Sequence, residues 1–163
     1  MEFRDLKKQY QVLKEDIDKK VQSVCASARY ISGPEVKEFE NQLAEYVGVK
    51  HCVTCANGTD AITLALKVWG IGEGDAVFIP DFTFFSSGEC PASEGATCVF
   101  VDVDERTYNL DAAKLEESIK KVLEEGVYKP KVVIAVDLFG LPADYEKIKS
   151  VCKKYNLLLS IPV

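Results

Sequence analysis

The sequence contains few of the residues that several common kinds of site require. Its 163 residues include one histidine, one methionine and one tryptophan. Because His51 stands alone, a zinc site would need further ligands, and we expect no metal centre. Lysine and arginine number 20 against 26 acidic residues, which leaves a net charge of −6. Without a basic surface to neutralise phosphates, nucleic acid is not expected as the main partner.

Long hydrophobic runs are also missing. No apolar stretch reaches the length that spans a bilayer, and the first residues, MEFRDLKK, do not form a signal peptide. The six cysteines fall mostly in predicted strands and helices, which is typical of buried cysteines in a reducing compartment. We therefore expect a cytoplasmic protein with no membrane partner.

Two of the cysteines have the spacing of a redox or zinc motif. Cys52 and Cys55 are separated by two residues, but both lie inside a strand pattern and not at the start of a helix. Residues at positions i and i+3 of a strand point to opposite faces. Structural packing is therefore the favoured interpretation, and a redox module is the alternative.

The order of apolar segments predicts an α/β fold. Helical spacing predicts helices at 5–25 and from Pro34 to Gly48, so we assign residues 1–48 to an N-terminal helical segment. From residue 49 to residue 163 strands alternate with helices, as in a parallel sheet whose strands are buried on both faces. The expected strands are 51–56, 76–80, 97–102, 131–137 and 157–161, and the expected helices are 59–69, 84–95, 111–125 and 143–155.

The most informative stretch joins the first expected strand to its helix through Asn57-Gly58-Thr59-Asp60. The start of a helix exposes unpaired backbone N–H groups and the positive end of the helix dipole, so it can hold an anion. Gly58 lets the backbone come close to a ligand, and Thr59 adds a hydroxyl. The alternative is a turn in which Asp60 merely caps the helix and nothing binds.

Several stretches together resemble the nucleotide-sugar aminotransferases of the DegT/StrS type, which depend on pyridoxal 5'-phosphate (PLP). They occur in that family's order and spacing and extend to about Leu159. The resemblance implies the fold type I architecture: a three-layer α/β/α domain with a mostly parallel sheet, here incomplete over residues 49–163. The stretches are FRDLKKQY (3–10), YISGPEVKEFE (30–40), NGTDAI (57–62), GEGD (72–75), PDFTF (80–84), FVDVD (100–104) and DLFGLPAD (137–144).

The resemblance also implies roles for individual residues. Gly58, Thr59 and Asp60 match the turn that holds the PLP phosphate, and Phe84 matches the aromatic residue that stacks on the pyridine ring. The alternative for Phe84 is a core aromatic. Tyr30 and Gln9 fall in segments that line substrate pockets in relatives, although a solvated helix face explains Gln9 equally well. The implied partners are a nucleotide-sugar substrate and further copies of the chain, as a homo-oligomer.

Two groups that the family's chemistry needs have no match here. Relatives carry an acid under the pyridine nitrogen where this chain reads Ser160-Ile-Pro-Val163, and their cofactor-binding lysine lies further on. Lys50, Lys67 and Lys131 do not match that lysine. We assign no catalytic residue and expect this chain alone to be inactive. The parent would transfer an amino group, with glutamate as the expected donor, to a nucleotide-linked keto-sugar. The alternative is a non-catalytic domain that binds a phosphate ligand or a partner.

The resemblance makes one prediction about pairing. In the family, the strand at 51–56 lies beside strands from later in the chain. Here it must slide in beside 157–161, pair with another copy, or stay loose, because unpaired backbone groups on a buried strand are costly. We expect self-association that involves 51–56 or 157–161.

Overall fold

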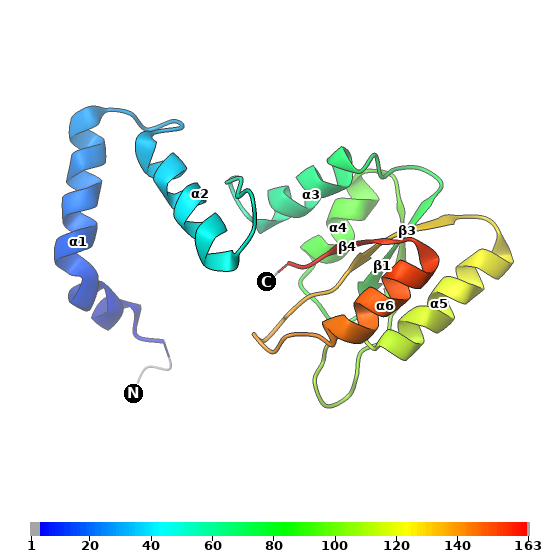
Figure 1. Cartoon of the computed structure of the whole chain (residues 1–163). Coiled ribbons are helices and arrows are strands. Elements are labelled where there is room, and N and C mark those ends of the chain that lie inside the picture. Colours follow the sequence, from blue (N-terminus) through cyan, green and yellow to red (C-terminus); the bar gives the residue numbers. More distant parts are fainter. Residues whose placement is uncertain (1–3, 163) are drawn as a thin grey trace. The chain divides into compact units, whose positions relative to one another are not determined.

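The computed structural model describes residues 4–162, so residues 1–3 and Val163, at the outer ends of the two expected domains, lie outside it. The chain forms two compact units, Met1–Thr54 and Cys55–Val163. The division falls a few residues after the expected boundary at 48 and within the stretch expected to form a strand. Each unit is described by itself (Figure 1).

The first unit consists of two helices, α1 (Leu6–Ser27) and α2 (Pro34–Val47), so both expected helices are confirmed. The Asp5 side chain caps α1 by accepting a hydrogen bond of 2.9 Å from the backbone N–H of Lys8. Gly48 ends α2 in the left-handed conformation, with φ of 76°. None of the described residues of α1 is buried, so its apolar positions face solvent within this unit.

The second unit alternates helices and strands, and its sheet is parallel throughout. Its strands are β1 (Asp75–Pro80), β2 (Thr97–Val101), β3 (Lys129–Ile134) and β4 (Leu158–Ser160), in the order β2-β1-β3-β4. Its helices are α3 (Gly58–Val68), α4 (Ser86–Ser93), α5 (Ala112–Glu125) and α6 (Tyr145–Tyr155). The predicted α/β class and parallel sheet are confirmed.

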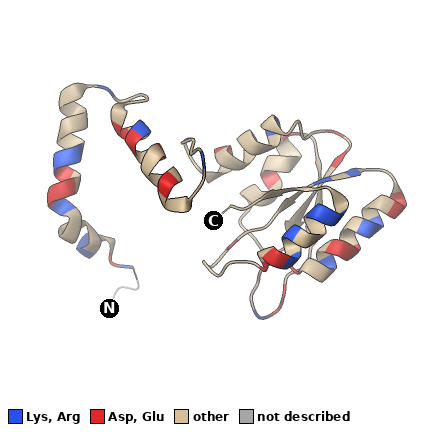
Figure 2. Cartoon of the chain, in the orientation of Figure 1, with Lys and Arg blue, Asp and Glu red and all other residues tan. Residues whose placement is uncertain are grey.

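Helices cover both faces of the sheet, which gives three layers (Figure 1). Along β1, Ala76 and Phe78 pack in one core cluster with α5 and α6, whereas Val77 and Ile79 pack in a second cluster with α3 and α4. All four side chains are fully buried. The continuous apolar run of this strand therefore reflects burial on two faces. Figure 2 shows lysines and acidic residues interspersed along α5 and α6, the helices that carry the ion pairs around Glu116.

The chain reverses direction across the sheet at β1. It moves from β1 to β2 through α4, then crosses back over β1 to β3 and on to β4 through α5 and α6. Because parallel crossovers are right-handed, the two directions place their helices on opposite faces. In open α/β sheets, ligands bind outside the carboxyl ends of the strands at such a reversal. A ligand site is therefore expected at the carboxyl ends of β1 and β3, where the direction changes.

The predicted strand at 51–56 is wrong. These residues have no regular secondary structure, and the Val53 side chain is 81% exposed. An apolar run forms a strand only beside a hydrogen-bonding neighbour, and among residues 4–162 β4 pairs with β3 alone. The stretch therefore does not slide in beside β4, and pairing with another copy stays a prediction. It is attached to α2 through Glu40, whose carboxylate accepts hydrogen bonds of 3.0 Å from both the backbone N–H and the hydroxyl of Thr54.

The expectation that the cysteines are buried is only partly correct. Cys90 and Cys152 are buried, Cys52 and Cys98 are half-buried, and Cys25 and Cys55 are exposed. Cys25 lies on α1, which has no buried residue, and Cys55 lies in the unpaired stretch, so neither side chain packs in a hydrophobic core. Within residues 4–162, no three histidine, cysteine, aspartate or glutamate side chains gather as a metal site would require, and no helix is both long and apolar enough to cross a membrane.

Candidate functional site

A cavity of about 430 Å³ lies at the carboxyl edge of the sheet, where the chain reverses. Its wall brings together the start of α3, the start of α4, and the segments that follow β3 and β4. These parts are far apart in sequence and meet only because parallel strands end at one edge. The lining residues are Asn57, Gly58, Thr59, Ile62, Phe84, Ser86, Ser87, Val136, Leu138 and Pro162.

The start of α3 forms the polar end of the cavity. Asn57 caps the helix: its side-chain oxygen accepts a hydrogen bond of 2.8 Å from the backbone N–H of Asp60. The backbone N–H groups of Gly58 and Thr59 come before any intrahelical acceptor, so both are open to a ligand. A Cβ at Gly58 would meet no atom within 4 Å, so packing within the protein does not require glycine there.

Asp60 takes part in the cap and does not line the cavity. Its N–H is bonded to the Asn57 side chain, and its carboxylate accepts a hydrogen bond of 3.2 Å from the Asn57 amide. The assignment of Asp60 to cofactor binding stays a prediction.

Phe84 forms part of the cavity wall and is 68% exposed. The core-aromatic alternative is therefore wrong for this residue; the aromatic side chain that fills the core is Phe78. An exposed ring beside a polar cavity can stack on a flat ligand.

The first turn of α4 completes that wall. Ser86 and Ser87 are 7% and 2% exposed, and the Ser87 hydroxyl is 2.9 Å from the hydroxyl of Thr83. A contact of 3.4 Å from the Cys90 thiol to the backbone carbonyl of Thr59 joins α4 to the start of α3. The two helix starts are thus held against one another.

The segment after β3 supplies the apolar part of the wall. Asp137 lies between the two lining residues Val136 and Leu138, and its carboxylate accepts hydrogen bonds from the Tyr145 hydroxyl at 2.5 Å and from the backbone N–H of Ala143 at 2.9 Å. Burial, and secondarily the bond to Asp137, raises the pKa of Tyr145 well above its usual value. These bonds fix the loop that carries Leu138.

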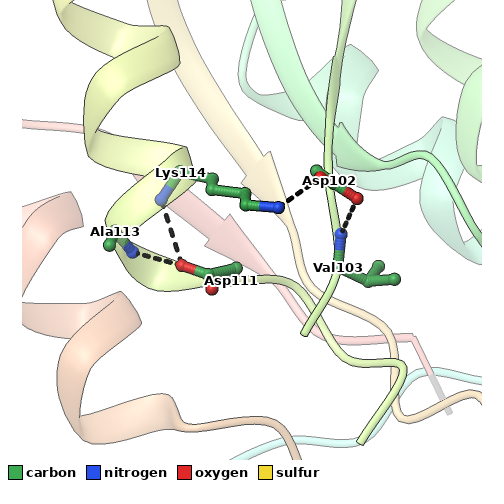
Figure 3. A network of polar contacts seen from close by, with 5 residues as sticks. All are labelled: Asp102, Val103, Asp111, Ala113 and Lys114. Atoms are coloured by element: carbon green, nitrogen blue, oxygen red, sulfur yellow. Dashed lines mark hydrogen bonds and ion pairs between the residues drawn. The ribbon is translucent and has the colours of Figure 1, made fainter. Parts of the chain in front are cut away.

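Other polar and aromatic side chains at the same edge of the sheet interact with one another. Figure 3 shows the Lys114 ammonium paired with the Asp102 carboxylate, while Asp111 caps α5 through the N–H groups of Ala113 and Lys114 at 2.8 and 3.0 Å. The pairing lowers the pKa of Asp102 and raises that of Lys114. The rings of Phe82, Tyr108 and Phe139 form a cluster with centroids 5.6 to 6.2 Å apart.

The structure brings only some of the predicted site residues together. Gly58, Thr59 and Phe84 share the cavity. Gln9 on α1 and Tyr30 between α1 and α2 are exposed and belong to the first unit, whereas the cavity is formed by the second unit alone. Five further lining residues were not predicted as part of the site: Ser86, Ser87, Val136, Leu138 and Pro162. Their only sequence signal is a place at the carboxyl end of a predicted strand or in the helix that follows it.

The cavity fits part of PLP. Its two open backbone N–H groups and the Thr59 hydroxyl suit a phosphate, and the exposed Phe84 ring suits a flat heterocycle. Among residues 4–162, no lysine and no carboxylate side chain lines it. Lys67, the lysine of α3, is 2.9 Å from the carboxylate of Glu94. The lining residues therefore offer binding groups and none of the groups that make the cofactor reactive.

Comparison with known proteins agrees with this fold. The chain belongs to the DegT/DnrJ/EryC1/StrS aminotransferase family, which it matches over residues 11–160. It is 43% identical over 157 residues to the UDP-2-acetamido-2-deoxy-3-oxo-D-glucuronate aminotransferase of Pseudomonas aeruginosa, an alignment that covers 96% of this chain and 42% of that protein.

Solved structures show the same relationship. The crystal structure of a DegT DnrJ EryC1 StrS aminotransferase from Brucella abortus has a TM-score of 0.97 and 45% identity over 99% of this chain and 43% of its own. The PLP form of a putative sugar aminotransferase from Streptococcus pneumoniae has a TM-score of 0.73 and 32% identity over 85% of this chain and 34% of its own. The chain thus spans less than half the length of the proteins it resembles, and the expected fold type I relationship is confirmed.

Proposed function

We propose that this chain is the N-terminal part of a longer PLP-dependent aminotransferase that acts on a nucleotide-linked keto-sugar, with glutamate as the amino donor. The observation that carries the proposal is the cavity in which the uncovered start of α3 faces the exposed ring of Phe84. Family membership and the UDP-linked sugar in the name of the Pseudomonas relative support the substrate class. Residues 49–163 would be the incomplete PLP-binding large domain.

Each lining residue has a role in holding the cofactor. The N–H groups of Gly58 and Thr59 and the Thr59 hydroxyl bind the phosphate, where the helix dipole favours an anion. Phe84 packs against one face of the ring. Val136 and Leu138 exclude water from the other side of the cavity. When bound, PLP supplies the electron sink that amino-group transfer requires.

The catalytic groups lie outside this set, so we propose that the chain by itself is inactive. Proton transfer in such enzymes needs a lysine that binds the cofactor covalently, and no lysine lines the cavity. A carboxylate at the ring nitrogen is likewise absent from the lining residues. Both groups would come from the part of the parent protein that relatives have beyond the matched region.

We assign Tyr30 and Gln9 to the substrate side of the parent enzyme, and we propose a cytoplasmic homo-oligomer. The six free cysteines support a reducing compartment. The exposed Val53 and the unpaired outer edge of β4 support self-association, since β4 pairs only with β3 among residues 4–162.

The direct test is to obtain the coding sequence on both sides of this segment and to purify the protein that it encodes. With PLP, glutamate and a UDP-linked keto-sugar, the longer protein should form an amino-sugar and 2-oxoglutarate. This chain under the same conditions should form neither. Turnover by this chain that depends on one of its lysines would contradict the inactivity, and a longer protein without activity on any nucleotide-linked keto-sugar would contradict the function.

A second candidate function is a non-catalytic domain that binds a phosphate ligand or a partner. The lack of any lysine or carboxylate in the cavity wall favours it. An absorbance scan after PLP is added to this chain separates covalent from loose binding. Loose binding leaves the spectrum of the free aldehyde, whereas a bond to a cavity lysine gives a distinct band at longer wavelength. A surrounding gene that encodes no further residues would favour this candidate.

A further inference from the structure

Two serine side chains of the cavity wall, Ser86 and Ser87, have no role in the site described so far. Ser86 lines the cavity and is only 7% exposed. Its hydroxyl forms no hydrogen bond with residues 4–162, in contrast to the neighbouring Ser87 hydroxyl, which is paired with Thr83. No side-chain nitrogen or oxygen in the described part of the chain is both fully buried and unbonded. The Ser86 hydroxyl must therefore keep some contact with solvent, and the cavity supplies that space.

The backbone N–H of Ser86 is also available to a ligand. Ser86 is the first residue of α4, so its N–H precedes any intrahelical acceptor. The position before it is Phe85, which supplies no side-chain cap. At the start of α4 the Ser86 N–H is therefore left for a ligand, whereas the N–H groups of Ser87 and Gly88 donate to the backbone carbonyls of Phe84 and Phe85 at 3.1 Å. At the start of α3 the N–H of Asp60 is used by Asn57, and those of Gly58 and Thr59 are open. Since residues of both starts line one cavity, the positive ends of two helix dipoles meet there.

No acidic side chain from the first turn of either helix lines the cavity among residues 4–162. Asp60 and Glu89 are the acids in the first turns of α3 and α4, but neither lines this cavity. Asp60 is bonded to Asn57. The cavity wall itself contains no acidic side chain that would repel an anion and no basic one that would attract it. Hydrogen-bond donors and helix dipoles are therefore the groups of the cavity wall that attract an anion.

We propose that the anion site of this protein is built from two helix starts, and that Ser86 is a binding residue that donates its hydroxyl hydrogen bond to a phosphoryl oxygen of the ligand. The site would take a phosphate monoester dianion. Gly58 and Thr59 contribute donors from one side, and Ser86 contributes its hydroxyl and backbone N–H from the other. This deepens the proposed function, because it names a further residue for the phosphate-bearing cofactor.

The test compares phosphate affinity in Ser86→Ala, Thr59→Ala and Ser93→Ala. Ser93 is the exposed serine at the other end of α4, so Ser93→Ala controls for loss of a hydroxyl from the same helix. Inorganic phosphate is the probe, titrated by calorimetry with the wild-type chain and each variant. A hydrogen bond to a charged group predicts that Ser86→Ala weakens phosphate binding by about tenfold or more. Thr59→Ala should weaken it similarly, and Ser93→Ala should leave it unchanged.

Two further measurements make each outcome decisive. The midpoint of urea unfolding shows whether Ser86→Ala still folds, which alanine in a helix favours. Titrating Ser86→Ala with PLP and with pyridoxal, which has no phosphate, tests whether the hydroxyl binds the phosphate or the ring. The proposal predicts that the variant binds PLP more weakly than the wild-type chain does and binds pyridoxal equally well. Wild-type phosphate affinity in Ser86→Ala, a loss confined to the ring compound, or no phosphate binding by the wild-type chain would each overturn it. Aminotransferase activity of the longer protein is measured separately, so failure of one proposal does not decide the other.

Discussion

The side-chain oxygen of Asn57 lies 2.8 Å from the backbone nitrogen of Asp60 and caps α3. This bond divides the donors at the helix start into two groups. The N–H of Asp60 is used within the protein, and the N–H groups of Gly58 and Thr59 are left for a ligand. The cap therefore also fixes which donors can hold an anion.

Asn57→Ala should lower the free energy of unfolding by about 1 kcal/mol, because it removes the cap of α3. Asn57→Ser keeps a capping oxygen without placing a second carboxylate beside Asp60, and it should lose much less. Urea unfolding of both variants measures the difference. Equal stability of the alanine variant and the wild-type chain would show that the cap does not stabilise the helix.

Tyr145→Phe should destabilise the fold, because it removes the hydroxyl that donates to Asp137 at 2.5 Å. Loss of a hydrogen bond to a carboxylate is expected to cost about 1–3 kcal/mol. The raised pKa of Tyr145 adds a pH dependence. Since the unfolded tyrosine loses its proton first, above about pH 10, the wild-type chain should lose stability as pH rises through that range. The phenylalanine variant should lose less over the same range; parallel pH profiles would contradict this.

Glu116 links α5 to α6 through Lys154 and Tyr155, at 2.6 and 2.9 Å. Hydrogen bonds to these partners lower its pKa from the usual 4.5 to about 2. The stabilisation is therefore present above pH 4.5 and is lost as pH falls toward 2. The melting temperature of the wild-type chain should fall more between pH 6 and pH 3 than that of Glu116→Gln, and salt should shrink the difference. Glu117→Gln, at an exposed neighbour on α5, should behave like the wild type.

Val53→Lys should reduce self-association of this chain if the unpaired stretch takes part in it. Val53 is 81% exposed, and a lysine there disfavours pairing with another copy. Val68→Lys, at an equally exposed position on α3, is the control and should change nothing. Light scattering at micromolar concentration gives the oligomeric state. A wild-type chain that is a monodisperse monomer would contradict self-association altogether.

The fold could be predicted from the sequence where local signals and burial agree. The expected helices 111–125 and 143–155 are present, and Asp111 and Asp144 cap them. The apolar runs of β1 and β3 are central strands with neighbours on both sides. The run at 51–56 looked equally apolar and is not a strand, because pairing depends on a neighbour that hydrophobicity does not reveal.

The candidate site could also be predicted only in part from the sequence. Gly58 and Thr59 could be found because a capped helix start forms an anion site locally, whether or not a strand precedes it. Ser86 and Leu138 could not, since they reach the cavity only through the order of strands in the sheet. Phe84 needed the family resemblance: three neighbouring phenylalanines fit a core equally well by sequence, and only the structure shows Phe84 exposed.

The central claim is that the start of α3 and the ring of Phe84 form a binding site for a phosphorylated cofactor. A crystal structure of this chain grown with an excess of PLP tests it most directly. The account predicts the phosphate within hydrogen-bond distance of the Gly58 and Thr59 N–H groups, with the pyridine ring against Phe84. An empty cavity with the Thr59 hydroxyl turned away, or PLP bound at another surface, would contradict it.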